Sequence, residues 1–210
     1  MSSYRKKRGL NARDTGFHKD DRLIIVASDD TYAPLQYFSF FPLPRVRLLI
    51  LPPVDTKSAA KHVLDNLLAC DEDYDERWLL LDVDHYAQGH HVASYMAAIR
   101  DAQAKGVRVA LSKPCFEVWL LLHHVPEDAI ESLTDCNSVT SALRSALGEY
   151  NKTCLKLQHF PLGRVQDAMD RSLRLDQDEY KIPTSNTTRV CQLWQSITSK
   201  MDPWQQLIHP

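Results

Sequence analysis

Short apolar runs alternate with segments of helical spacing along the first half of the chain. The runs are typical of strands that are buried on both faces of a sheet. They lie at residues 22–27, 45–51, 78–81 and 107–111. Between them, apolar residues recur every three or four positions at residues 56–68 and 91–104, with Asp55 or Thr56 as the expected N-cap of the first helix. This alternation predicts an α/β fold with a mostly parallel sheet flanked by helices.

The second half of the chain follows a helical pattern. Helices are expected at residues 115–123, 138–147, 164–173 and 188–200. No strand of comparable strength and no Ser-, Gly- or Pro-rich linker occurs there. We therefore divide the chain into an arm at 1–21, an α/β core at 22–114 and a C-terminal helical extension at 115–210 that packs on the core. For the aromatic, proline-interrupted residues 32–44 no element is predicted.

Composition excludes several classes of protein. Only 6 of the 210 residues are glycine, and none of their spacings matches a phosphate-binding loop or a dinucleotide-binding turn. The five cysteines contain no C-x-x-C pair and no secretory segment opens the chain, so we expect a reduced, cytoplasmic compartment. The apolar runs are far shorter than the roughly 20 residues that cross a bilayer, so no membrane span is expected.

Positive charge is concentrated at the start of the chain. The first 22 residues carry a net charge of +4, against −6 for the remainder. Such an arm favours binding to nucleic-acid phosphates, and a solvated terminus is an equally good interpretation. The residues that we assign to nucleic-acid binding are Arg5, Lys6, Lys7, Arg8 and Arg13.

Acidic side chains follow two of the predicted strands. Asp29 and Asp30 come after the first, and Asp82 and Asp84 after the third. Ligands of open parallel sheets bind beyond the carboxyl ends of the strands, and residues i and i+2 of a strand point the same way. Carboxylate oxygens suit Mg²⁺ or Mn²⁺, so Asp29, Asp82 and Asp84 are candidate metal ligands. The alternative is that these aspartates cap the turn or helix that follows.

Histidines offer weaker signals. His85 directly follows Asp84 and is a candidate proton shuttle or phosphate-orienting residue, with a surface histidine as the alternative. The adjacent pairs at 90–91 and 123–124 do not face a common point in a helix or strand, so a zinc site is not expected.

The segment Ala110 to His124, ALSKPCFEVWLLLHH, resembles the RloB family of phage-defence proteins, which are associated with restriction loci and abortive infection. The family pattern here is close to S-N-P-C-F-E-x-W-L-L-L-H, and Lys113 stands where the family often has asparagine. The basic N-terminus, the D-x-D at Asp82 and Asp84, and the Y-x-K element at 150–152 also resemble the family. Nearly the whole chain is covered.

The resemblance implies a Toprim-like core, the Mg²⁺-binding α/β fold of topoisomerases, primases and related nucleases. A Toprim site uses a glutamate after the first strand and a D-x-D after the third, which Asp82 and Asp84 match. Asp29 replaces the glutamate, and Asp30 replaces the following glycine. Because aspartate is one methylene shorter, its carboxylate falls short by about 1.5 Å. A displacement near 1 Å costs roughly a hundredfold in rate, so we expect metal binding to survive and turnover to fall.

Glu117 lies in an apolar helical segment, where an unpaired charge is costly. Two interpretations have equal weight. In the first, Glu117 forms an ion pair with Lys113, four residues before it. In the second, it faces the carboxylates at the strand ends as a further metal ligand or base.

These features lead to one principal hypothesis, a Mg²⁺-dependent nuclease that hydrolyses DNA or RNA as an anti-phage effector. Its catalytic candidates are Asp29, Asp82, Asp84, Glu117, His85 and Lys113. The alternative is a catalytically degenerate recognition or regulatory subunit that docks, by resemblance, to an ABC-type or AAA-type ATPase. A small-molecule phosphohydrolase is a third option. A homo-oligomer is compatible with each.

Overall fold

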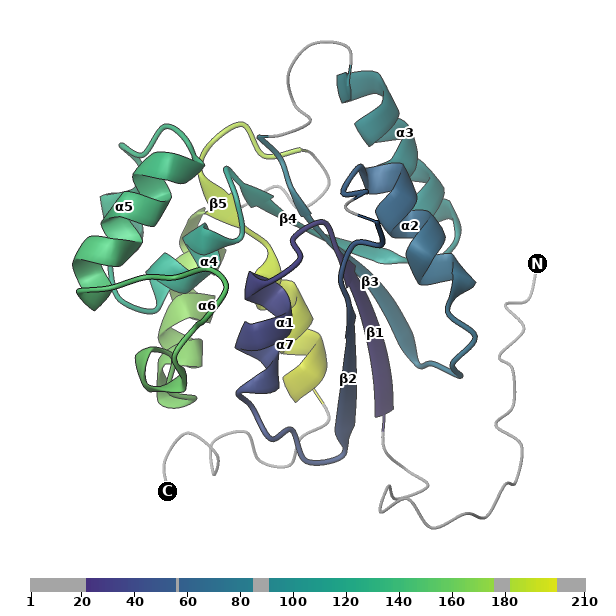
Figure 1. Cartoon of the computed structure of the whole chain (residues 1–210), viewed down its shortest axis with the longest axis horizontal. Coiled ribbons are helices and arrows are strands. Elements are labelled where there is room, and N and C mark those ends of the chain that lie inside the picture. Colours follow the sequence, from purple (N-terminus) through teal and green to yellow (C-terminus); the bar gives the residue numbers. More distant parts are fainter. Residues whose placement is uncertain (1–21, 56, 85–90, 176–181, 200–210) are drawn as a thin grey trace.

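The structure is a computed structural model, and it describes residues 22–55, 57–84, 91–175 and 182–199. One sheet with strand order β2-β1-β3-β4-β5 forms its centre (Figure 1). The strands are β1 (Arg22–Ser28), β2 (Val46–Leu51), β3 (Glu76–Asp82), β4 (Arg108–Lys113) and β5 (Thr187–Thr188). The first four pair in parallel, and β5 is antiparallel to β4. The prediction of a mostly parallel α/β sheet is confirmed.

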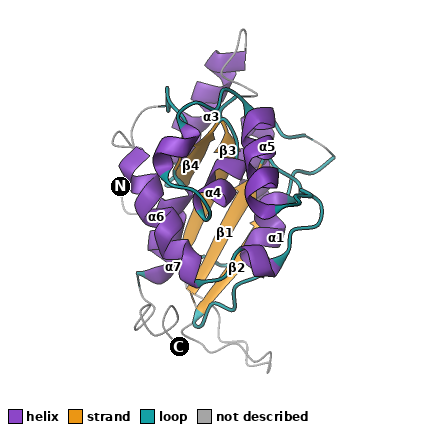
Figure 2. Cartoon of the chain, turned by 90° about the vertical axis from the view of Figure 1, so that its left-hand side faces the viewer, coloured by secondary structure: helices purple, strands orange, loops and turns teal. Residues whose placement is uncertain are grey.

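Helices cover both faces of this sheet. They are α1 (Ala33–Ser39), α2 (Ala60–Ala69), α3 (His91–Ala104), α4 (Glu117–Leu122), α5 (Cys136–Leu147), α6 (Gly163–Leu175) and α7 (Val190–Thr198). Two short 3₁₀ helices are η1 (Glu127–Ile130) and η2 (Leu157–His159). Helices α2 and α3 lie on one face, and α1 and α4 to α7 lie on the other (Figures 1 and 2). The predicted flanking helices and C-terminal helix are therefore present.

The side chains of β1 point alternately to the two faces of the sheet, which allows a helical layer to pack on each face. Leu23, Ile25 and Ala27 pack with α2 and α3, whereas Ile24 and Val26 pack with the helices of the opposite face. Successive side chains of a strand point to opposite faces, so one apolar run serves both layers. The second layer joins strand residues and residues of the helical extension in one hydrophobic cluster.

Sheet connectivity marks the place where a ligand site is expected. β1 pairs with β2 on one side and β3 on the other, so Ile24 is opposite both Leu48 and Glu76. The chain runs from β1 to one neighbour and later enters the other, which makes the carboxyl end of β1 a topological switch point. Asp29 directly follows β1 at this point.

Helix α4 is buried along its whole length, which is unusual for a helix that begins with a glutamate. Trp119 is fully buried, and Tyr37 of α1 packs edge-on against it with ring centroids 6.2 Å apart. Two arginines of α6 satisfy carbonyls at the helix end. Arg171 Nη1 donates to Leu122 O at 2.7 Å, and Arg164 Nη1 donates to His123 O at 3.3 Å. Packing and capping together fix the direction of α4, and with it Glu117.

Some local predictions are wrong. Helix α2 begins at Ala60 after Ala59, with no side-chain cap, because Asp55 has a φ of 53° and belongs to a turn before the helix. Helix α1 occupies part of the segment with no predicted element, since Pro34 stands in its first turn, where proline is tolerated. The expected helix at 188–200 is preceded by β5 and begins only at Val190. A two-residue strand is too short to give a sequence pattern.

One pair of cysteines is bonded, although the sequence predicts a reduced compartment. Cys115 and Cys136 form a disulfide with a Cα–Cα distance of 5.8 Å, joining the segment before α4 to the first residue of α5. Cys70, Cys154 and Cys191 are free. Within the described ranges, no helix combines the length and the hydropathy that crossing a membrane requires.

Candidate functional site

Carboxylates from two strand ends meet at the switch point. Asp82 is the last residue of β3, and its backbone N–H donates to Asp29 Oδ2 at 2.8 Å. Asp29 N donates in turn to Leu80 O at 3.3 Å, so the ends of β1 and β3 are tied together. Both aspartates are partly exposed to solvent. Both residues are therefore half-buried at the carboxyl edge of the sheet, and burial is sufficient to raise the pKa of their carboxyl groups.

Asp30 has a structural and an electrostatic role. Its Oδ1 accepts hydrogen bonds from Tyr32 N at 2.8 Å and Ala33 N at 3.3 Å, which starts α1. This is the capping role that the sequence left open for these aspartates. Its Oδ2 lies 2.8 Å from Lys152 Nζ. The side chain of Asp30 is thus built into the fold through one oxygen, and its second oxygen faces a cation.

Glu117, the first residue of α4, is only 3 % exposed. Its Oε1 accepts a hydrogen bond from Tyr150 OH at 3.0 Å and lies 3.2 Å from Lys152 Nζ. Its Oε2 is buried and finds no hydrogen-bond partner among the described residues. The ion pair with Lys113, one of the two interpretations of Glu117, is not formed. Glu117 pairs with Lys152 instead, and Lys113 Nζ donates to Thr184 O at 2.8 Å.

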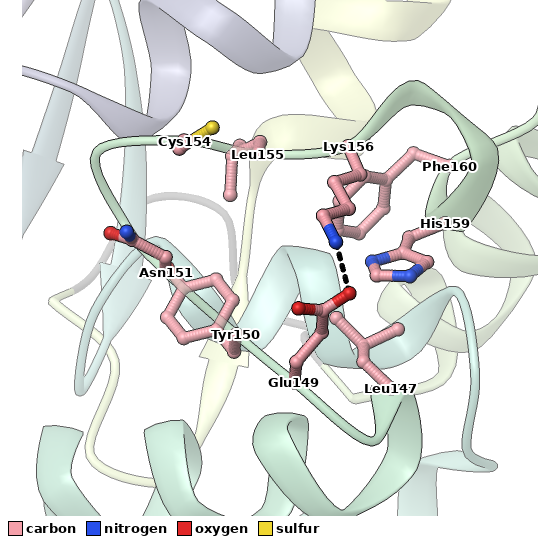
Figure 3. Close-up of a pocket in the computed structure, with 9 residues that line it drawn as sticks. All are labelled: Leu147, Glu149, Tyr150, Asn151, Cys154, Leu155, Lys156, His159 and Phe160. Atoms are coloured by element: carbon pink, nitrogen blue, oxygen red, sulfur yellow. Dashed lines mark hydrogen bonds and ion pairs between the residues drawn. The ribbon is translucent and has the colours of Figure 1, made fainter.

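The loop after α5 brings Tyr150 and Lys152 to the carboxylates. Gln36 of α1 holds this loop at two points, since its Nε2 donates to Lys152 O at 2.9 Å and its Oε1 accepts from Leu155 N at 2.9 Å. The same loop borders a pocket of about 100 Å³, in which Lys156 and Glu149 point toward one another as an ion pair (Figure 3). The pocket and the carboxylates are thus joined by one short segment.

Burial and excess negative charge together shift the pKa values of the site. Burial raises the pKa of Asp82 well above its ordinary value, and the carboxylates of Asp29, Glu117 and Asp30 raise it further. Burial likewise raises the pKa of Asp29 to about 7, although the hydrogen bond from Asp82 N opposes the shift. Burial lowers the pKa of Lys152, but Glu117 and Asp30 outweigh this effect and the pKa is raised. A further cation would relieve the repulsion.

The structure does not bring every sequence candidate into this group. The carboxylates of Asp29, Asp82 and Glu117 interact electrostatically. Strand β3 ends at Asp82, so the strand alternation that would point Asp84 the same way as Asp82 does not extend to Asp84. Asp84 N instead approaches Pro114 O at 3.4 Å. His85 and the basic residues of the arm lie outside the described residues.

These carboxylates determine whether the site can bind a metal ion. Within the described ranges, no group of three or more His, Cys, Asp or Glu side chains is already arranged to hold a metal ion. The chemistry of the donors nevertheless fits Mg²⁺ or Mn²⁺. Lys152 pairs with Asp30 and Glu117 only, Asp29 and Asp82 add further negative charge, and a buried oxygen of Glu117 lacks a partner among the described residues. Asp29, Asp82 and Glu117 are the residues that would hold such an ion.

Sequence reasoning missed three residues of the site as functional candidates. They are Asp30, Tyr150 and Lys152. The Y-x-K element was visible as part of the resemblance, and it is this element that contacts Glu117. Nothing in the local pattern of the loop indicates that it returns to the strand ends, because that contact depends on the packing of α4 and α5.

Together these features define an α/β protein with an acidic site at the carboxyl edge of a parallel sheet. A family model described as RloB-like protein matches residues 24–197, and the chain belongs to this RloB-like family. The match includes the two strand ends, α4 and the loop that carries Lys152. No curated protein and no solved structure matches the chain.

Proposed function

We propose that this chain is a metal-dependent nuclease with a Toprim-like site, acting on DNA or RNA in anti-phage defence. The observation that carries the proposal is the meeting of Asp29, Asp82 and Glu117, with their mutual repulsion, at the switch point of the sheet. Asp82 agrees with the first aspartate of the Toprim D-x-D, and Asp29 stands in place of the Toprim glutamate. Membership of the RloB-like family supports the defence role.

In this proposal, Asp29 acts in proton transfer and the basic arm binds the nucleic-acid backbone. When bound, a divalent cation would polarise the scissile phosphate and stabilise charge on it. Asp29 is oriented by Asp82 N through Oδ2, and its Oδ1 would accept the proton of the attacking water. The basic residues of the arm would add backbone affinity without sequence preference.

The direct test is incubation of the purified chain with labelled DNA and RNA in Mg²⁺ or Mn²⁺. We expect cleavage by wild type and a loss of at least about a hundredfold in Asp82→Asn, since a carboxylate that holds the ion is removed. The matched control is Asp101→Asn, because Asp101 is a partly exposed residue paired with Lys105 on α3. Equal cleavage by wild type and Asp82→Asn would show that the nuclease acts elsewhere or is a contaminant.

One observation favours a second function. Lys152 already neutralises part of the charge of Asp30 and Glu117, as in a site that has lost its metal. On this alternative, the chain recognises nucleic acid or regulates a partner, with an ABC-type or AAA-type ATPase as the proposed partner. A Mn²⁺ titration that gives no heat with wild type would favour this alternative.

A further inference from the structure

Lys152 reaches into the carboxylate site from the solvent side. Its side chain is 43 % exposed, whereas those of its partners Asp30 and Glu117 are each 3 % exposed. Its ammonium contacts one oxygen of each carboxylate, at 2.8 Å and 3.2 Å. A lysine ammonium is a compact charge on a flexible four-carbon stem, so its head can move while its backbone stays in place.

The backbone of Lys152 is held independently of its side chain. Gln36 Oε1 accepts a hydrogen bond from Leu155 N, and Gln36 Nε2 donates one to Lys152 O. These two bonds anchor the loop on α1. Loss of the ion pairs with Asp30 and Glu117 would therefore leave the loop attached. The ammonium group would be free to contact another anion at the mouth of the site.

The present contacts leave the site incompletely satisfied. Tyr150 and Lys152 both use Oε1 of Glu117, while the buried Oε2 has no partner among the described residues. A buried carboxylate oxygen without a partner carries the full cost of desolvation. The unpartnered Oε2 therefore points to a second cation. This cation would share Glu117 with Lys152 and weaken the ion pair between them.

We infer that Lys152 is a substrate-binding residue whose ammonium is held by Asp30 and Glu117 and moves to the scissile phosphate when a divalent cation binds Glu117. This inference rests on the proposed nuclease function. Metal and substrate are thereby coupled, because the cation that completes the site also releases the group that binds the phosphodiester. Lysine is suited to such a transfer, since it binds phosphate as a point charge.

Calorimetric titration with Mn²⁺ tests the competition between lysine and metal. We expect Lys152→Gln to bind Mn²⁺ about tenfold more tightly than wild type, because the competing ammonium is gone. At saturating Mn²⁺ its single-turnover cleavage should fall by about a hundredfold, since one contact to the phosphate is lost. Lys156→Gln is the matched control on the same loop, where Lys156 pairs with Glu149, and it should behave as wild type in both measurements.

A second measurement uses the wild-type chain and needs no variant to fold. Lysines are acylated with and without Mn²⁺, and modification is located by mass spectrometry. We expect Mn²⁺ to raise the acylation rate of Lys152 about fivefold or more while that of Lys156 is unchanged, and a bound oligonucleotide to reverse the increase. If wild type binds no Mn²⁺, the proposed nuclease fails and the inference fails with it. If wild type binds Mn²⁺ but acylation of Lys152 is unchanged, or Lys152→Gln binds Mn²⁺ no more tightly, only the inference is overturned.

Discussion

Asp29 links the protonation of the candidate site to the stability of the fold. Burial raises its pKa from 3.8 to about 7. Between these values the folded protein holds a proton that the unfolded chain has released. The unfolding free energy of the metal-free protein therefore falls as pH rises through this interval. Below the lower value both states are protonated, and the carboxyl then costs the fold nothing.

We expect Asp29→Asn to remove this part of the pH dependence. In a chelator, urea unfolding at about pH 5 and about pH 8 should show wild type losing at least about 1 kcal/mol relative to the variant as pH rises. Asparagine keeps an oxygen that can accept from Asp82 N. Asp101→Asn is the control and should follow wild type. Parallel pH profiles for Asp29→Asn and wild type would contradict the raised pKa.

At the scale of single residues, the acidic strand ends could be predicted because Asp29 and Asp82 directly follow apolar runs. The role of Lys152 could not, since the 34 residues between it and Glu117 give no indication that they meet. Glu117 was left with two interpretations for a related reason. Helical spacing brings Lys113 near it, but Lys113 belongs to β4 and donates to a carbonyl instead.

At the scale of elements, Gln36 joins α1 to the loop that carries Lys152. We expect Gln36→Ala to lower the unfolding free energy by about 1–3 kcal/mol, because two backbone groups lose their partner. Limited proteolysis should also cut the loop faster. Gln103→Ala, at an exposed position of α3, is the control. Unchanged stability and unchanged proteolysis in Gln36→Ala would show that the loop is held by other contacts.

Helix α4 depends on α6 for the capping of its last turn. Arg171→Met should destabilise the protein by about 1–2 kcal/mol, since Leu122 O loses its donor while much of the aliphatic stem is retained. Arg174→Met on the same helix should have a much smaller effect, because Arg174 is exposed and pairs with Glu127 at the surface. Thermal and urea unfolding measure both variants. Equal effects of the two substitutions would contradict the capping role.

The long elements were predictable because their apolar patterns are periodic over many residues. Helix α1 was missed because the prolines and aromatic residues of the segment 32–44 indicate a break, although Pro34 is compatible with a first turn and Tyr37 and Phe38 are buried. Strand β5 was missed because its two threonines are too few to show a periodic pattern. Both elements are fixed by tertiary contacts, which a local pattern does not contain.

At the scale of the whole molecule, the uneven distribution of charge separates the arm from the acidic site. The first 22 residues have a net charge of +4 and the remainder −6. We expect replacement of Arg5, Lys6, Lys7 and Arg8 by glutamine to weaken nucleic-acid binding and to reduce the slope of log affinity against log salt by about 3. Binding measured from low to moderate salt checks this. A slope equal to that of wild type would remove the arm from the interface.

The α/β fold could be predicted as a whole because alternating strands and helices leave few arrangements. The candidate site could be predicted only in part, since strand ends meet by topology whereas loops and helices meet by packing. This difference explains why Asp29 and Asp82 were found from the sequence while Tyr150 and Lys152 required the structure.

The central claim, that the carboxylates at the switch point hold a divalent cation, is tested most directly by calorimetric titration with Mn²⁺. Wild type and Asp101→Asn should both show saturable heat, and Asp82→Asn should bind at least about tenfold more weakly, because one ligand has lost its charge. No heat with wild type, or equal affinity for wild type and Asp82→Asn, would contradict the account.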